Sequence, residues 1–148
     1  MGKKEEVKNG HVKEIIGIFV LTACLFITIS LLSYSEYDPA FLQQGIDKKT
    51  LNWGGRVGSH ISDGLFFLIG FSAYLLPVIL FVISIKLLLK KDSPFKTTIV
   101  LSFLSLLASF SGLISMFSAD RFAAGGLIGG YIDYFLEGYL NTIGTIIL

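Results

Sequence analysis

Three long stretches of the chain carry no charged residue. They run over residues 15–35, 64–85 and 97–119 and contain 21, 22 and 23 residues. A helix rises about 1.5 Å per residue, so each stretch can reach about 30 Å, the thickness of the hydrocarbon core of a bilayer. Only 16% of the 148 residues are charged, whereas a soluble domain carries about a quarter. The pattern excludes a soluble globular domain and a disordered chain, and it predicts a polytopic membrane protein.

The predicted fold is an all-α integral membrane protein, an antiparallel bundle of transmembrane helices with an amphipathic outer segment. We expect a tail over residues 1–14 and a membrane domain over residues 15–148. Its spans are predicted at about 15–35, 64–86, 97–118 and 139–148. The last of these is too short to cross a bilayer as a helix. The chain is therefore interpreted as three complete spans and the start of a fourth, that is, as a truncation or fragment.

The positions of the basic residues predict the orientation. The tail and the link between the second and third spans hold eight of the twelve Lys and Arg residues, and the two other loops hold four. Positive residues accumulate on the cytoplasmic side, so we expect a cytoplasmic N-terminus and outer loops at residues 36–63 and 120–137. The net charge of +1 gives no global basic field that would attract nucleic acid.

A proline interrupts the second predicted span. Pro77 has no backbone N–H and crowds the carbonyl of Ala73, so a kink is predicted near Ala73–Pro77, with Tyr74 among the nearest polar side chains. The kink could be a hinge or a partner contact. An ordinary bend is the simpler interpretation, because proline is common in membrane helices.

Small residues recur at helical spacing in the third span. Ser105, Ser109 and Gly112 lie on one side together with Ser102, and Ala108, Ser111 and Ser115 lie beside them. Small residues let helix backbones approach closely, so this side is predicted to be a packing face. A polar translocation path is the alternative, but no ionisable residue accompanies the serines.

The segment before the fourth span contains two glycine pairs, Gly125 with Gly129 and Gly126 with Gly130, each spaced for close backbone contact. Drawn as a helix, its two faces differ. One carries Leu127, Tyr131, Tyr134 and Phe135, and the other carries Gly126, Gly130, Asp133 and Glu137. This predicts an amphipathic helix at the interface with an acidic face. A loop followed by a short helix is the alternative, since glycine lowers helix propensity.

No catalytic, cofactor-binding or metal-ligating set is predicted. Residues 54–58 are glycine-rich but lack the lysine of a phosphate-binding loop, and we interpret them as a flexible turn. His60 and Asp63 have no second histidine on the same side of the membrane to complete a metal site. Cys24 follows a stretch shaped like a lipoprotein cleavage box, but the apolar residues after it favour an uncleaved span.

Four stretches, taken in order, resemble one family. They are residues 31–35 (Leu-Leu-Ser-Tyr-Ser) with Asp38-Pro39, residues 52–58 (Asn-Trp-Gly-Gly-Arg-Val-Gly), residues 65–77 (Leu-Phe-Phe-Leu-Ile-Gly-Phe-Ser-Ala-Tyr-Leu-Leu-Pro) and residues 124–129 (Ala-Gly-Gly-Leu-Ile-Gly). Their order and spacing resemble the N-terminal four-span membrane domain of the FtsK/SpoIIIE family of bacterial DNA translocases.

The resemblance implies a membrane anchor and oligomerisation domain at the division septum, in the bacterial inner membrane, acting in cell division and chromosome segregation. It implies the lipid bilayer, other copies of the chain in a hexamer and other division proteins as partners. DNA, ATP and Mg would be bound only by a C-terminal motor, which this chain lacks, so no enzyme activity is expected here. A fragment of a small multi-pass transporter or channel subunit is the alternative, and an intramembrane enzyme is a third that lacks a reactive constellation.

Overall fold

The computed structural model describes residues 2–38, 50–89 and 97–147, and all the regular structure in these residues is helical. The elements are α1 (Gly2–Leu32), α2 (Gly55–Ile69), the short 3-10 helix η1 (Gly70–Tyr74), α3 (Leu75–Leu88), α4 (Thr97–Phe117) and α5 (Arg121–Ile147). The predicted all-α membrane bundle is confirmed. Pro94 and most of the link between the second and third spans lie outside the described residues.

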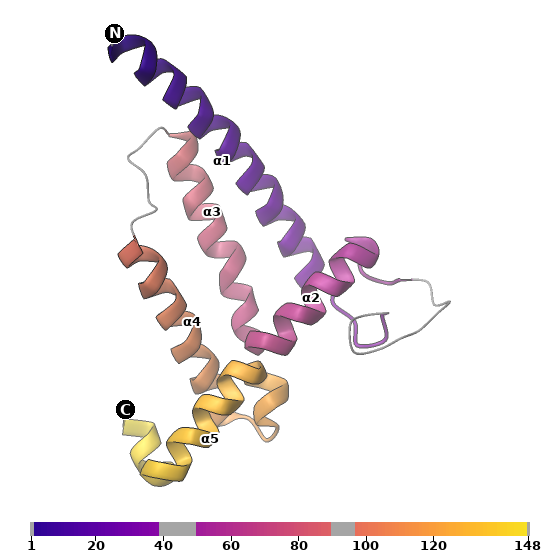
Figure 1. The fold of residues 1–148 in the computed structure, drawn as a ribbon. Coiled ribbons are helices and arrows are strands. Elements are labelled where there is room, and N and C mark those ends of the chain that lie inside the picture. The colour runs from indigo at the N-terminus through magenta and orange to yellow at the C-terminus, as the bar shows by residue number, and fades with distance from the viewer. Residues whose placement is uncertain (1, 39–49, 90–96, 148) are drawn as a thin grey trace.

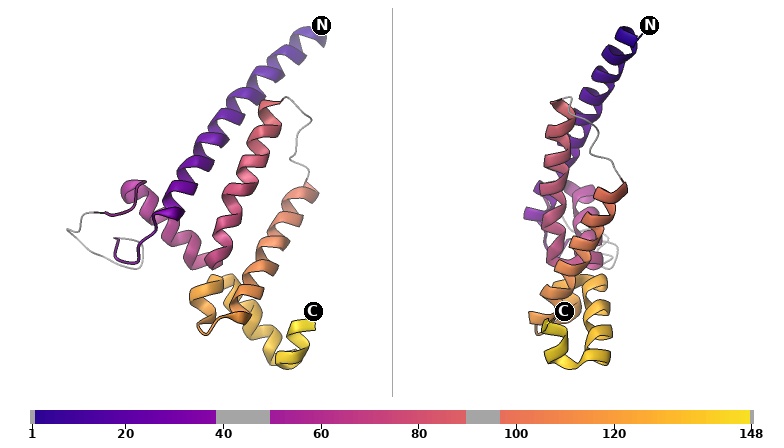
Figure 2. Two further views of the ribbon diagram at one scale, coloured as in Figure 1. Left: turned by 180° about the vertical axis from the view of Figure 1, so that it is seen from behind. Right: turned by 90° about the vertical axis from the view of Figure 1, so that its left-hand side faces the viewer.

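The helices form two pairs that meet at one end of the molecule. α1 packs along α3, and α4 packs against α5 (Figure 1). The two pairs are joined by α2 and η1, which contact α5 and, to a lesser extent, α4. We call this the distal end, because it lies opposite the N-terminus in all three views (Figures 1 and 2). The buried apolar core lies at this end and contains Leu31, Ile69, Ala73 and Leu107.

Within the described residues, three helical stretches are long and apolar enough to cross a membrane. They are His11–Leu32, Gly55–Leu88 and Val100–Phe117. Large side chains along them remain exposed, among them Phe19, Val78 and Leu101. Such apolar surface is stable only in lipid or against another protein.

Polar and small groups join α1 to α3. Near the cytoplasmic end predicted above, Gly17 leaves room for the side chains of Leu87 and Leu88. Further along, the thiol of Cys24 donates a hydrogen bond to the carbonyl oxygen of Pro77 at 3.2 Å. Cys24 is thus a buried part of an uninterrupted helix.

The second span bends earlier than the sequence predicts. α2 ends at Ile69, and Gly70 adopts φ +57°, a conformation that L side chains rarely adopt. The chain then forms η1 and resumes as α3. Pro77 is the third residue of α3, where its missing N–H breaks no intrahelical bond. The change of direction therefore starts at Gly70, while Tyr74 ends η1 and Pro77 lies in the first turn of the helix that follows.

The region before this bend is more ordered than predicted. Residues 54–58 do not form a flexible turn, because α2 begins at Gly55 and continues for 15 residues. Gly58 is buried beside Ser30 and Asn52. Helix formation here is possible because the turn is made by residues 52–54, just before the helix begins.

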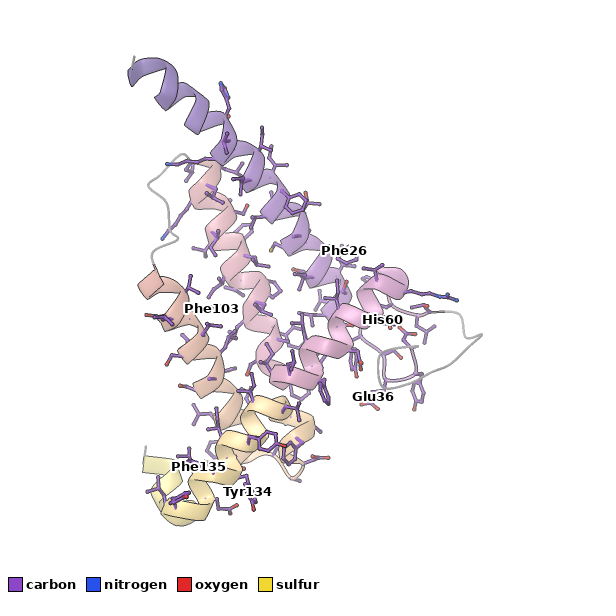
Figure 3. The ribbon with its side chains drawn as sticks, in the orientation of Figure 1. Phe26, Glu36, His60, Phe103, Tyr134 and Phe135 are labelled. Carbon is purple, nitrogen blue, oxygen red and sulfur yellow. The ribbon has the colours of Figure 1, made fainter. Side chains whose placement is uncertain are left out.

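The two faces of α5 are arranged differently from the prediction. The helix changes direction at Gly126, where φ is +65°. Beyond it, Asp133 is only 4% exposed, whereas Tyr131, Tyr134 and Phe135 are each more than 60% exposed; Figure 3 shows Tyr134 and Phe135 on the outside of α5. On the glycine and acidic face, Gly126, Gly130 and Asp133 are thus buried within the chain, and Glu137 is half-buried. Glycines allow this, because they let α4 and η1 approach the α5 backbone.

Candidate functional site: the distal helix crossing

Two bent helices cross at their bends. A Cβ atom at Gly126 would lie 2.5 Å from the backbone nitrogen of Gly70 and 2.6 Å from that of Ile69. A Cβ atom at Gly70 would lie 2.6 Å from the nitrogen of Gly126 and still closer to the carbonyl of Ala124. We call this pair the glycine crossing. Both glycines combine a positive φ with backbone contact, so neither position has room for a side chain.

The glycines of α5 also pack against α4. The hydroxyl of Ser111 donates a short hydrogen bond to the carbonyl oxygen of Gly125 and lies 3.4 Å from that of Ile69. A Cβ atom at Gly125 would lie 2.6 Å from Cβ of Ser115, and one at Gly129 would lie 2.6 Å from the hydroxyl of Ser111. Small residues on both helices thus allow the two backbones to lie close together.

The remaining predicted packing residues divide into two groups. Gly112 contacts Ile132 of α5, and Gly130 contacts the ring of Phe122. Ser105 and Ser109, in contrast, are exposed on α4. The structure therefore brings Gly125, Gly126, Gly129, Gly130 and Gly112 into contacts within the chain, and leaves the two serines on an outward face.

A second cluster holds the chain that leads from α1 to α2. The carboxylate of Asp38 accepts hydrogen bonds from the backbone N–H groups of Leu51 and Asn52 at 2.7 and 2.8 Å. The side-chain oxygen of Asn52 accepts one from the N–H of Gly54 at 2.9 Å. Asp38 and Asn52 are 3% and 4% exposed. We call these two residues the loop lock, since they tie the two ends of the intervening segment together.

The loop lock also completes the end of α1. The side-chain amide of Asn52 donates to the carbonyl oxygens of Ser30 at 2.8 Å and Ser33 at 3.3 Å. The hydroxyl of Tyr74 donates to the carbonyl oxygen of Leu31 at 3.3 Å. The last carbonyls of a helix have no partner within the helix and need one from elsewhere. Asn52 and Tyr74 supply it, so α1 ends at a defined place relative to α2 and η1.

Reactive groups do not gather in the described residues. There, no group of three or more His, Cys, Asp or Glu residues could hold a metal ion. Nδ1 of His60 lies 2.7 Å from the carbonyl oxygen of Arg56 in the preceding turn of α2. The distal end is thus built for helix packing.

Sequence reasoning missed Gly70, Asp38 and Asn52 as site residues. Gly70 had one available signal, since a glycine in the interior of an apolar helix is unfavourable by about 1 kcal/mol relative to alanine and needs a reason. The contact between Asp38 and residue 52 had no signal in the sequence, because a loop has no periodicity from which to infer a contact.

The sequence that forms these helices matches a known protein family. Residues 9–148 match the family described as the 4TM region of DNA translocase FtsK/SpoIIIE. The chain belongs to the FtsK/SpoIIIE family. The described elements from α2 to α5 lie within the matched region, and α1 lies in it from residue 9 onward, so the glycine crossing and the loop lock are parts of an FtsK/SpoIIIE membrane region.

Individual relatives agree with the family. The protein named DNA translocase FtsK from Shewanella oneidensis is 34% identical over 133 residues, which cover 83% of this chain and 14% of the relative. The proteins of the same name from Vibrio vulnificus and Pseudomonas putida are 29% and 27% identical, over 91% and 93% of this chain and 14% and 18% of their own lengths. The chain thus spans less than a fifth of each of these relatives. None of the solved structures matches it.

Proposed function

We propose that the chain is the membrane anchor and oligomerisation domain of a DNA translocase that acts at the division septum. The observation that carries the proposal is the match of residues 9–148 to the FtsK/SpoIIIE membrane region. ATP, Mg and DNA would be bound by a motor outside this chain, and the chain itself has no enzymatic role. Its partners are the bilayer, other copies in a hexamer, and other division proteins.

The distribution of charge supports an anchor over the alternative of a transporter or channel subunit. Val100–Phe117 contains no Asp, Glu, Lys or Arg, and α3 contains only Lys86, in its last turn. Ion and proton pathways usually place an ionisable residue at membrane depth. A chimera tests this directly: this chain replaces the membrane region of the Shewanella oneidensis relative.

We expect the chimera to support division and chromosome segregation, and an unrelated four-span anchor in the same place to fail. If both chimeras fail alike, the chain carries no septal function beyond its hydrophobicity and the proposal is wrong. The genomic reading frame offers an independent check. A phosphate-binding loop and a RecA-like pattern several hundred residues downstream support the proposal, and many further spans contradict it.

The orientation makes a separate prediction. The lysine-rich tail and link predict that a topology reporter inserted at Lys91 is cytoplasmic and that one at Lys48 is outside. Both positions lie outside the described residues. One reporter that is active only in the cytoplasm and one that is active only outside are inserted at each position. External activity at Lys91 and cytoplasmic activity at Lys48 would refute a cytoplasmic N-terminus.

Oligomerisation needs a surface that the chain does not use for its own fold. α3 and α4 share no extensive contact within the described residues, and Ser105 and Ser109 are exposed on α4. Small residues on an outward face of a membrane helix favour association with a neighbouring helix. The glycines of α5 are less available for this purpose, because α4, η1 and Phe122 already occupy them.

Replacing both Ser105 and Ser109 with Leu is expected to lower the yield of crosslinked oligomer about fivefold, which corresponds to about 1 kcal/mol. Insertion and helix content should not change, since both side chains are exposed. Replacing Gly126 and Gly130 with Leu is the contrasting pair, expected to lower the amount of folded chain. An oligomer yield that the serine variant leaves unchanged would exclude this face of α4.

A further inference from the structure

The second membrane stretch is too long for one straight crossing. Gly55–Leu88 contains 34 residues, which would measure about 50 Å as a straight helix. The hydrocarbon core of a bilayer is only about 30 Å thick. The 5 residues of η1 and the 14 residues of α3 reach about 30 Å by themselves. The crossing is therefore complete without α2, and the place of α2 needs a separate explanation.

Both ends of α2 lie level with the end of α1. At the start of α2, a Cβ atom at Gly58 would lie 2.7 Å from the hydroxyl oxygen of Ser30. Near its other end, the ring centroid of Phe66 lies 4.5 Å from that of Tyr34. Ser30 and Tyr34 are each two residues from Leu32, where α1 ends, whereas positions 58 and 66 are about 12 Å apart along α2. α2 thus runs across the end of α1 (Figure 1), at the level where the first membrane stretch ends.

One side of α2 is apolar and is not covered by the described part of the chain. Small and apolar residues recur there at the spacing of one helix side, at Val57, Ile61, Gly64, Leu65 and Leu68. Val57 and Leu68 are 64% and 48% exposed, and a Cβ atom at Gly64 would meet nothing within 4 Å. A groove of about 590 Å³ on this side is lined only by residues of α2, namely Arg56, Val57, His60, Ile61, Gly64 and Leu65. Such a surface needs lipid or another apolar partner.

The adjacent side of α2 is polar. Arg56, His60 and Asp63 recur at the same spacing, and Arg56 is exposed. Figure 3 shows His60 on the distal side of α2, the side on which Glu36 lies. The remaining side packs inside the chain through Gly58, Ser59, Ser62 and Ile69. Exposed apolar and polar sides next to each other are typical of a helix that lies in the membrane–water interface. Trp53, just before the helix, is 79% exposed, and tryptophan favours the same region.

We propose that α2 is a membrane-surface helix, which lies in the interface of the leaflet at the distal end. Its apolar side, including Val57, Ile61 and Leu68, lies among the upper acyl chains, and Arg56 extends to the lipid phosphates. The second crossing then begins at Gly70, whose positive φ turns the chain from the interface into the bilayer. The assignment requires that the chain spans a membrane, and it is independent of orientation and of any septal role.

The level of α2 and the arginine beside its apolar side favour lipid over a second copy of the chain as the partner of this surface. A second copy would have to match an apolar surface that lies flat at the membrane boundary and carries an exposed guanidinium at its edge. The headgroup region offers both of the required surroundings, since it is anionic above and apolar below.

Spin labels on single cysteines measure the depth of α2. The full chain carries Cys24→Ser, which keeps a donor for the carbonyl of Pro77, and is placed in vesicles of phosphatidylethanolamine and phosphatidylglycerol. Labels at positions 57 and 68 should lie at the same depth within about 5 Å. Positions 71 and 82 are the matched control, because they are also eleven positions apart and exposed. Their labels should differ in depth by about 15 Å.

Neighbouring labels and the natural tryptophan give two further readouts. A label at Arg56 should be reached mainly by an aqueous nickel chelate and one at Val57 mainly by oxygen, although the two positions are adjacent. The unsubstituted chain has one tryptophan, Trp53. Its fluorescence should be quenched more by bromine near the lipid headgroups than by bromine deep in the acyl chains, and this measurement does not depend on any variant folding.

Three results would overturn the proposal. A difference in depth of about 16 Å between positions 57 and 68 would mean that α2 crosses the bilayer. Free access of the nickel chelate to both positions would place the apolar side in water. Exclusion of both oxygen and nickel at position 57, with magnetic coupling between labels on different chains, would make a second copy the partner of this surface.

Discussion

Replacing either Gly70 or Gly126 with alanine is expected to lower the free energy of unfolding by about 2–5 kcal/mol. Two separate penalties add at these positions. Each glycine has a positive φ, at +57° and +65°. Each also has backbone atoms of the opposite helix where a Cβ would lie. Backbone cannot rotate away as a side chain can, so the crossing must open.

Alanine variants at three other glycines measure the conformational penalty and the overpacking penalty separately. Gly55 has a φ of +64° but open space around it, so Gly55→Ala should lower stability by about 1–2 kcal/mol through conformation alone. Gly129 has no positive φ but contacts Ser111, so Gly129→Ala should lower it by about 1–3 kcal/mol through overpacking alone. Gly64 has neither problem, and Gly64→Ala should raise stability by about 0.5–1 kcal/mol.

Unfolding of each variant in mixed micelles, followed by circular dichroism during detergent titration, gives the ranking. The alanine variants at Gly70 and Gly126 should be destabilised most, followed by those at Gly129 and Gly55. The Gly64 variant should be more stable than the wild type. Should Gly70→Ala and Gly126→Ala be no more harmful than Gly55→Ala, the two bends would not be in contact in the membrane.

Replacing Asn52 with alanine is expected to lower the free energy of unfolding by about 2–3 kcal/mol. The change removes the donor to the carbonyl oxygens of Ser30 and Ser33 and the acceptor for the N–H of Gly54. Residue 52 is 4% exposed, so water does not readily replace these partners. Buried polar groups left without partners carry the full penalty of desolvation.

The neighbouring Trp53 provides the control. Its side chain is 79% exposed, and its backbone N–H keeps its bond to the hydroxyl of Ser33 in a Trp53→Ala variant. That variant should change stability by no more than about 0.5 kcal/mol. Amide hydrogen exchange gives the local readout: the N–H of Gly54 should exchange faster in Asn52→Ala and normally in Trp53→Ala. Equal protection in both variants would mean that Asn52 does not hold the loop.

The sequence predicts the membrane class and helical fold well, because charge-free stretches of more than twenty residues leave few alternatives in a bilayer. It also predicts that the glycines at 125, 126, 129 and 130 pack closely. The sequence does not show which part of the molecule these glycines pack against. Helical spacing places residues on one face, but whether that face meets another copy or another part of the same chain depends on tertiary structure. Here the partners are α4, the end of α2 and η1, with Phe122 of α5 itself.

The bend of the second span shows the same limit. Pro77 is the obvious helix-breaking residue, and local chemistry alone favours a kink there. The structure bends at Gly70, because the chain must pass the backbone of Gly126, which is 56 positions further along. Once the helix has restarted at Leu75, Pro77 lies in a first turn, where proline is well tolerated. Long-range contact decides the position of the bend. The only local sign of it is Gly70 itself, because glycine is unfavourable in the interior of an apolar helix.

The exposed side of α5 could not be inferred either. An isolated amphipathic helix directs its charged face to water and its aromatic face to lipid. In this chain the acidic face is also the glycine face, and close packing of the glycines brings Asp133 inside. The sequence predicts which residues share a face, and tertiary packing decides what surrounds that face.

The most direct test of the proposed septal anchor is the localisation of the chain in a dividing cell. A fluorescent protein joined to its N-terminus, expressed in a bacterium whose own DNA translocase lacks its membrane region, measures the ratio of midcell to lateral membrane signal. We expect clear enrichment of the wild-type chain at midcell and loss of this enrichment in the Gly126→Ala variant. An even distribution of the wild-type chain around the envelope would contradict it.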